Sequence, residues 1–350
     1  MDRKRVYITG VVLAGFAVLV YTQFRTWTSF DWGTFWAQTH RVSKRHIFHA
    51  VALIYLAYGF RAVRWRIFLR PVRPEMTMLS LLSPTLVGFT GLALLGRPGE
   101  FIRPYLIARR TKLPFSSQIA VWTVERIFDV GAFTVLMLLA IYLPSALRQI
   151  PHPEMYAKFR QAGVLLIGLV VGMTVTAVVI ARSGEAIAEW VEDGLAQRAP
   201  HFGSKLALKI REFGQGLNTI HGPISLLGLS LVSLGMWYII ALAYQEVTHS
   251  YGVAALNIRV SQILILMGSS MLGSMVQLPG VGGGSQLATI AALYHVFDVP
   301  KELAASCGIM LWLVTFVAVV PVGLLLAHRE RLSLRKLSEE SHHAEEAGVV

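Results

Sequence analysis

The residues best suited to chemistry lie in the segment 96–110, GRPGEFIRPYLIARR. Glu100 carries a carboxylate and Arg97 and Arg103 carry guanidinium groups, beside glycines and prolines and between two apolar runs. Charged side chains are costly in lipid, so they face a protein interior or a water-filled cavity and mark sites for charged ligands. Irregular backbone at membrane depth must likewise be covered by protein or face a water-filled cavity. The segment therefore predicts a polar binding site, with Gly99 in its turn, inside a membrane protein.

The composition is that of an integral membrane protein. Of the 350 residues, 54% are hydrophobic and 15% charged, and several apolar runs reach the roughly 20 residues that cross a bilayer. The net charge of +12 comes from short basic clusters beside these runs, which is typical of cytoplasmic loops rather than of nucleic-acid binding. A single cysteine, Cys307, excludes an intramolecular disulfide and a cysteine-based metal site. We expect no nucleic-acid partner, no metal and no cofactor.

The apolar runs predict an all-α polytopic protein with about six full transmembrane helices. We place these helices at about 6–24, 47–60, 115–143, 163–180, 223–243 and 304–327. The first helix follows a basic N-terminus, and no small-residue cleavage site comes after its apolar run, so we expect it to be retained. We expect both chain termini to lie in the cytoplasm. The basic stretch after the second helix, which contains Arg61, Arg64 and Arg66, is placed in the cytoplasm as well.

Two further segments, 76–112 and 260–297, predict re-entrant hairpins. As a full span, 76–95 would leave five following cations outside, whereas a hairpin keeps them in the cytoplasm. A hairpin needs helix breaks and small surfaces for close backbone packing, and these are expected from Pro84, Gly88, Gly91, Gly96, Pro98 and Gly99. A full span is the alternative. With the basic tail in the cytoplasm, the number of full crossings requires the second hairpin to enter and leave from the outside. An offset of 186 residues relates Pro98 to Gly284 and Glu100 to Gln286, which predicts inverted repeats, a construction found in transporters.

Further candidate site residues lie on the helix at 115–143 and in the second hairpin. Glu125, Arg126 and Asp129 are about one helical turn apart and can share a face. They form either a headgroup site or an ion-pair network that fixes helix packing. The stretch PGVGGGSQ supplies backbone amides and polar groups for a substrate, or else a glycine-rich kink that allows close packing. Its candidate residues are Pro279, Gly282, Gly283, Gly284, Ser285 and Gln286.

The domain organisation is simple. Residues 1–327 are expected to form one integral membrane domain, and 183–222 to form a cytoplasmic insert of amphipathic helices. Residues 328–350 are expected to be a disordered cytoplasmic tail.

The chain resembles the family of the lysylphosphatidylglycerol synthase transmembrane, or flippase-like, domain. The resemblance covers about 47–327 and rests on four motifs, which are Arg97-x-Gly99-Glu100-x-x-Arg103-x-x-Leu106, Glu125-Arg126-x-x-Asp129, the pair Arg64-Trp65 and the loop at Pro279-Gly280. The late motif of the family is similar to Pro-Gly-Gly-x-Gly-x-x-Glu. Here Val281 replaces a glycine and Gln286 stands in the place of the glutamate.

The resemblance implies movement of a phospholipid or other anionic amphiphile between the leaflets of a bacterial cytoplasmic membrane. The family domain occurs fused to an aminoacyltransferase, so we expect this chain to be the transport part, with membrane lipids and a separate lipid-modifying enzyme as partners. In this hypothesis Arg97 and Arg103 attract the lipid phosphate. The alternative is a membrane-embedded transferase acting on a lipid or polyprenyl-linked substrate, with Glu100 or Asp129 as base. A structural partner of another membrane enzyme is a third hypothesis.

Overall fold

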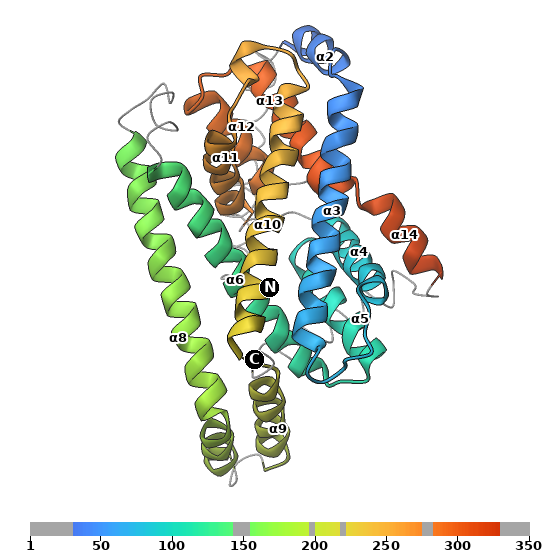
Figure 1. The fold of residues 1–350 in the computed structure, drawn as a ribbon, viewed down its shortest axis with the longest axis vertical. Coiled ribbons are helices and arrows are strands. Elements are labelled where there is room, and N and C mark those ends of the chain that lie inside the picture. The colour runs from blue at the N-terminus through green and yellow to red at the C-terminus, as the bar shows by residue number, and fades with distance from the viewer. Residues whose placement is uncertain (1–30, 143–154, 196–199, 218–221, 275–282, 330–350) are drawn as a thin grey trace, which may run out of the picture.

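The computed structural model describes residues 31–142, 155–195, 200–217, 222–274 and 283–329. The regular elements in these ranges are all helices (Figure 1). In chain order they are α2 (Trp32–His40), α3 (Lys44–Leu69), α4 (Met78–Leu95), η1 (Arg97–Phe101), α5 (Ile102–Thr111), α6 (Phe115–Tyr142), α8 (Met155–Leu195), α9 (Pro200–Leu217), α10 (Gly222–His249), η2 (Ala254–Leu256), α11 (Val260–Gly273), α12 (Gly284–His295), α13 (Lys301–Trp312), η3 (Leu313–Val317) and α14 (Val320–Arg329). The predicted helix at 6–24 and nearly all of the predicted tail lie outside the described residues.

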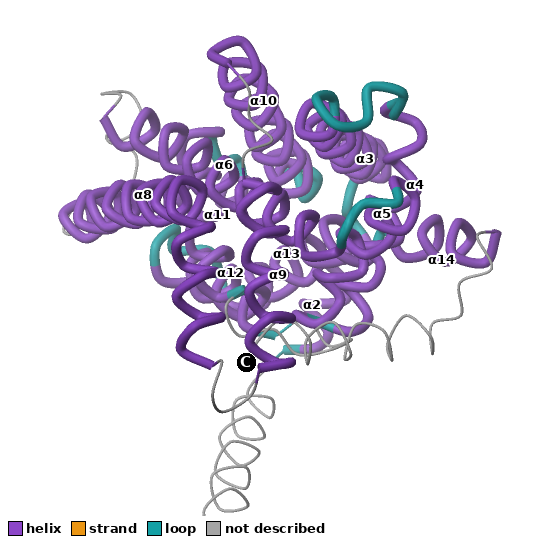
Figure 2. Tube along the Cα trace, turned by 90° about the horizontal axis from the view of Figure 1, so that it is seen from below, coloured by secondary structure: helices purple, strands orange, loops and turns teal. Residues whose placement is uncertain are grey.

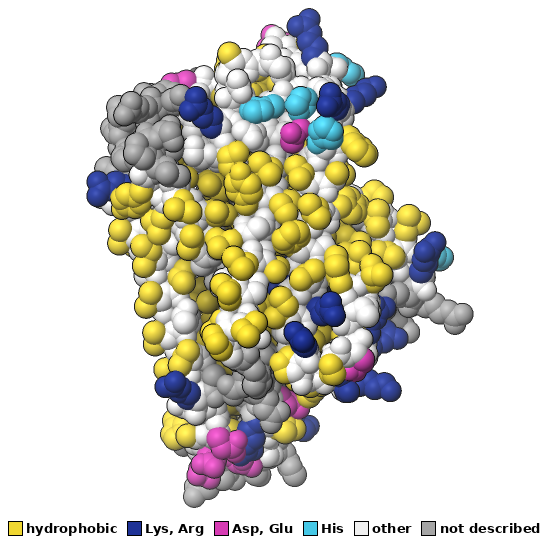
Figure 3. Space-filling view, viewed as in Figure 1, with side chains coloured by type: hydrophobic (Ala, Val, Ile, Leu, Met, Phe, Trp, Pro, Cys, Tyr) yellow, Lys and Arg dark blue, Asp and Glu magenta, His cyan; other side chains and the backbone are white. Residues whose placement is uncertain are grey.

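Five of the described helical stretches are long and apolar enough to cross a membrane. They are Lys44–Leu69, Met78–Leu95, Arg160–Ile180, Gly222–His249 and Lys301–Arg329. Hydrophobic side chains cover the broad middle of the face shown in Figure 3, and most charged and histidine side chains gather toward its two ends. An apolar band between two polar ends is the surface that a bilayer requires. The predicted all-α polytopic fold class is therefore confirmed.

The segment 76–112 folds as a hairpin of two helices. α4 ends at Leu95 and is followed by Gly96, whose φ of 72° and ψ of −147° are suited to glycine. After η1 the helix α5 packs back along α4 (Figure 1). Arg110, near the end of α5, donates a hydrogen bond to the backbone carbonyl of Ser80, near the start of α4. Both ends of the segment thus lie at the same end of the molecule, as a re-entrant hairpin requires. Its depth in the bilayer stays a prediction.

Helix breaks at Pro84, Gly88 and Gly91 are wrong, because α4 continues through all three residues, but the small surfaces for close packing that were expected there are present at Gly88 and Gly91. Pro84 lacks the N–H that would bond to the carbonyl of Ser80 four residues earlier, and Arg110 donates to that carbonyl instead. Gly88 and Gly91 serve packing rather than bending. A Cβ atom at Gly88 would overlap Arg103 of α5, and Gly91 lies directly against the backbone of Gly99 in η1.

The second hairpin consists of α11 and α12. The tip of α11 meets the start of α12 so closely that a Cβ atom at Gly273 would overlap the carbonyl of Gly284. α12 begins after Gly283, whose φ of 86° and ψ of −143° nearly repeat the angles of Gly96. Figure 1 shows this hairpin in the half of the molecule that contains α2, whereas α4 and α5 lie in the other half.

The two hairpins touch at their turns. Arg97 donates from Nη2 to the backbone carbonyl of Ser274 at 2.9 Å, and from Nη1 to Oε1 of Glu100 at 3.2 Å. Two hairpins from opposite halves that meet at their tips have the geometry an inverted repeat would produce. The repeat itself stays a prediction.

One long helix joins the predicted span at 163–180 to the predicted amphipathic insert. α8 is a single helix of 41 residues that continues past Ile180, and α9 returns beside it (Figure 2). Gly184 and Gly214 allow the two helices to approach closely, and Arg211 of α9 pairs with Glu185 of α8 at 2.8 Å. Gly216 packs against the backbone of Ser117 in α6. These contacts fix the insert to the rest of the bundle.

We expect the open ends of the two hairpins to face opposite sides of the membrane. With Cys307 replaced by Ser, the variants Lys112→Cys and Ala255→Cys each place one thiol at an exposed position, after α5 and before α11 respectively. A membrane-impermeant maleimide should label the first only from the cytoplasm and the second only from outside. Labelling of both from one side would contradict the arrangement.

Candidate functional site

The carboxylate of Glu125, in the middle of α6, is fully buried and surrounded by donors. Arg103 of α5 forms a forked pair with both of its oxygens, with Nη1 3.0 Å from Oε1. Arg64 of α3 donates to Oε1 at 2.5 Å, and the indole of Trp65 donates to Oε2 at 3.0 Å. One carboxylate thereby joins three helices, and the forked geometry is the strongest form of such a pair.

Asp129, one helical turn further along α6, extends the network to α10. Its Oδ1 accepts hydrogen bonds from Arg64 at 2.7 Å and from the indole of Trp237 at 3.2 Å. Its Oδ2 lies 3.0 Å from Arg126. Arg64 also donates to the hydroxyl of Ser233 at 3.0 Å. Arg64 thus contacts α6 and α10 from its place in α3.

The network has more positive than negative charge. Its guanidinium groups belong to Arg61, Arg64, Arg103 and Arg126, and its carboxylates to Glu125 and Asp129. Four cations share two anions, which leaves the cluster with a net charge of +2. Arg61 is only 8% exposed, and its Nη1 lies 3.7 Å from Asp129 and makes no hydrogen bond within the described residues. A buried charge without full compensation is costly, which favours binding of an anion.

A cavity of about 580 Å³ lies beside this network, between the two hairpins. Its charged and polar lining includes Arg61, Arg97, Glu100, Arg126, Asp129, Ser270 and Ser274. Aromatic rings hold two of the cations in place, since Arg61 lies 4.7 Å from the ring centre of Phe89 and Arg126 5.7 Å from that of Trp122. The cavity therefore presents oriented guanidinium groups to any anionic ligand that enters it.

The predicted site residues lie in several different places. Arg97, Glu100, Arg126 and Asp129 line the cavity. Arg103 and Glu125 lie behind its wall and connect helices, and Gly99 packs against Gly91. Gly283 and Gly284 start α12, and Ser285 and Gln286 line a separate small cavity of about 10 Å³ that shares wall residues with the large one. Pro279 and Gly282 lie outside the described residues.

Two arginines of the cluster lie in a helix and not in the basic stretch that the charge pattern predicts. The helix predicted to end near Phe60 continues to Leu69, so Arg61 and Arg64 are buried in the bundle instead of lying in a basic stretch after the helix. The charge rule counts cations near a helix end and takes no account of carboxylates on another helix. The spacing of Arg61, Arg64 and Trp65 was an available signal, because it places all three on one helical face opposite a matching pair on α6.

Replacing Glu125 should destabilise the protein far more than replacing Glu100. In Glu125→Gln the buried Arg103 loses its carboxylate, a change that costs about 3–5 kcal/mol in comparable buried pairs. Glu100 pairs with Arg97, whose side chain is half exposed, so Glu100→Gln should cost less than about 1 kcal/mol. Thermal unfolding of the two variants in detergent measures the difference. Equal shifts would show that Glu125 does not hold the bundle together.

Comparison with known proteins agrees with this architecture. No curated protein and no solved structure matches the chain. A family model, described as the lysylphosphatidylglycerol synthase TM region, matches residues 7–323. The match covers α2 to α13 and the first turn of α14, including both hairpins and the charged network. The chain therefore belongs to the family of the lysylphosphatidylglycerol synthase transmembrane region, as the resemblance of its motifs indicated.

Proposed function

We propose that this protein moves a phospholipid or another anionic amphiphile between the two leaflets of a membrane. The observation that carries the proposal is a cavity with surplus positive charge, enclosed by broken helices inside an apolar bundle. A family linked by its name to lipid handling agrees with a lipid as the substrate. We place the protein in the bacterial cytoplasmic membrane, with both termini in the cytoplasm and a separate lipid-modifying enzyme as partner.

The lipid phosphate binds at the cations that face the cavity. Arg126 is one-third exposed and Arg61 has an unused donor, so both can form charge-assisted bonds with phosphate oxygens. Binding of an anion offsets the surplus charge of the network. The inner pair of Arg103 and Glu125 is already complete and keeps the helices in place while the outer cations exchange ligands.

Access to the cavity changes at the contact between the hairpin turns. Arg97 bridges Glu100 and the carbonyl of Ser274, so it connects η1 to the end of α11. A phosphate that attracts Arg97 competes with both of these acceptors and weakens the contact. Separation of the turns on one side and then on the other would carry the headgroup across.

The transferase alternative needs a carboxylate that is free to accept a proton. Oδ1 of Asp129 accepts hydrogen bonds from Arg64 and Trp237, whereas Oδ2 lies near Arg61 and Arg126 without a hydrogen bond from the described residues. Glu100 is the better candidate base, and it pairs only with Arg97 in the described contacts. Both candidate bases are paired with guanidinium groups, Asp129 with Arg61, Arg64 and Arg126 and Glu100 with Arg97, which favours transport over transfer.

Transport can be measured in liposomes that contain the purified protein and a small amount of fluorescent phosphatidylglycerol. A membrane-impermeant reductant should bleach nearly all of the label, compared with about half in protein-free vesicles, because lipid moves to the outer leaflet. The variant Arg126→Gln should slow this movement roughly tenfold, the ratio that about 1.4 kcal/mol of barrier produces. Removing an equal charge at the exposed Arg109, in Arg109→Gln, should have no effect.

Two results would overturn the proposal. If vesicles with the wild-type protein lose no larger fraction of their fluorescence than protein-free vesicles, the protein does not transport this lipid. A change in the mass of the recovered lipid, measured by mass spectrometry, would instead support the transferase.

A further inference from the structure

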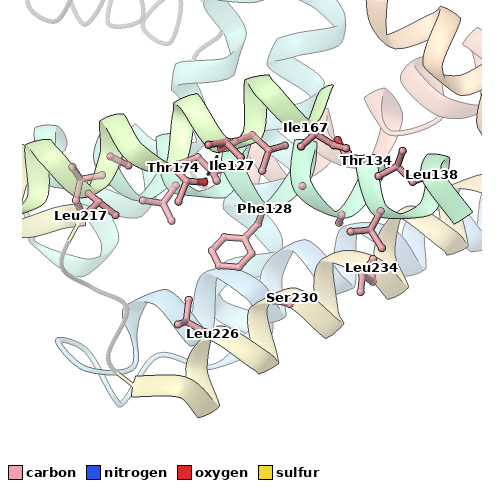
Figure 4. Close-up of a pocket in the computed structure, with 18 residues that line it drawn as sticks. Ile127, Phe128, Thr134, Leu138, Ile167, Thr174, Leu217, Leu226, Ser230 and Leu234 are labelled. Carbon is pink, nitrogen blue, oxygen red and sulfur yellow. Dashed lines mark hydrogen bonds between the residues drawn. The ribbon is translucent and has the colours of Figure 1, made fainter. Parts of the chain in front are cut away.

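A second cavity, apolar and about 590 Å³ in volume, lies between α6, α8 and α10. Figure 4 shows that side chains of these three helices surround it, with Phe128 pointing into the space between α6 and α10. Leu217 of α9 lines one end. The polar residues in its wall are Thr134, Thr174 and Ser230. We call this cavity the apolar groove.

The wall of the apolar groove suits a hydrocarbon ligand. Thr134 donates its hydroxyl hydrogen to the carbonyl of Val130 at 2.7 Å, and Thr174 donates to Val170 at 2.7 Å, each within its own helix. These hydroxyl groups have their donors satisfied before any ligand arrives. A polar ligand would gain little here, whereas burial of apolar surface is favourable.

The cavity of about 580 Å³ that is lined by Arg61 and Arg126 is called the cationic cavity below. The apolar groove adjoins it along α6, α8 and α10. On α6, Val130 lines the cationic cavity and Gly131 the groove, and on α8 the corresponding neighbours are Met173 and Thr174. On α10, Trp237 lines the cationic cavity, and Leu234, about one turn earlier, lines the groove. An anion site that continues into a hydrocarbon site matches a molecule in which a phosphate and an acyl chain are joined.

We propose that the apolar groove binds one acyl chain of the lipid whose phosphate lies in the cationic cavity. The inference rests on the proposed function and adds a site for the tail and a path of entry. The lipid enters sideways between α8 and α10, which Figures 1 and 2 show on either side of α6. Its headgroup moves toward Arg126 while the chain stays in apolar surroundings. Recognition then depends on both parts of the lipid.

Gly131 offers a position at which the groove can be filled. A Cβ atom there would meet only Val170, at 3.8 Å, so a larger side chain would extend into open space. The matched control is Gly168 on α8, which is exposed, does not line the groove and has nothing within 4 Å of an added Cβ atom. Gly131→Phe and Gly168→Phe therefore add the same bulk inside and outside the groove.

Photo-crosslinking tests occupancy directly. A phosphatidylglycerol with a diazirine in the middle of one acyl chain is added to liposomes that contain the full-length protein, and adducts are located by mass spectrometry. We expect adducts at the groove residues Phe128 and Leu234 that fall at least severalfold in Arg126→Gln. Adducts at Leu165, which is 74% exposed, should not change. If adducts at the groove are as insensitive to Arg126→Gln as those at Leu165, the groove holds only bulk lipid and the proposal is wrong.

Transport provides the second test. Gly131→Phe should slow lipid movement roughly tenfold, which corresponds to about 1.4 kcal/mol of barrier, and Gly168→Phe should match the wild type. Val135→Trp, at a groove residue that is 45% exposed, fills the groove as well and replaces Gly131→Phe if that variant does not fold. If the wild type transports lipid and both groove variants transport it at the same rate, the acyl-chain site is refuted but the proposed function is not. A wild type that moves no lipid would refute the proposed function, and crosslinking would still decide whether the groove holds a chain.

Discussion

The structure depends on one buried carboxylate, that of Glu125. An isolated carboxylate in a low-dielectric interior is so unfavourable that its neighbours must supply donors at nearly every lone pair. Arg64, Arg103 and Trp65 do so from α3 and α5, which places these helices against the middle of α6. Because the geometry of the forked arginine pair is specific, the contact also sets the register of α5 against α6.

From this fixed point the charges divide into an inner and an outer set. The inner set of Arg64, Arg103 and Glu125 is buried and engaged in helix contacts. The outer set faces the cavity and contains Arg61, Arg126 and Asp129, with Arg97 and Glu100 at the turn of the first hairpin. An ion-pair network that fixes packing and a site for an anionic headgroup were alternatives in the sequence analysis. The geometry accommodates both, since adjacent residues of α6 belong to different sets.

The helix breaks have a complementary role. Gly96 and Gly283 adopt nearly the same backbone angles, which side-chain-bearing residues rarely adopt, and each lets a short helix start inside the bundle. The turns meet through Arg97 and Ser274 beside the cationic cavity. The apolar groove next to that cavity gives the interior a polar and an apolar compartment. A molecule with a charged head and a hydrocarbon tail fits such a pair of compartments.

The sequence by itself determined the fold class, the family and the main elements. Apolar runs and glycine breaks located α6, the start of α10 and both hairpins to within a few residues, since hydrophobic length and backbone geometry are local properties. The motif residues Arg97, Glu100, Arg126 and Asp129 were also identified as site candidates, and all four line the cavity. Only the tertiary structure decided that Arg61 and Arg64 are buried, because their burial is stabilised by carboxylates on α6 more than sixty residues away. It likewise decided that Pro84 leaves α4 unbroken, since the carbonyl freed by the proline is satisfied by Arg110 from another helix. A charge or a missing hydrogen bond acquires its meaning from its partner, and partners distant in sequence are brought together by folding alone.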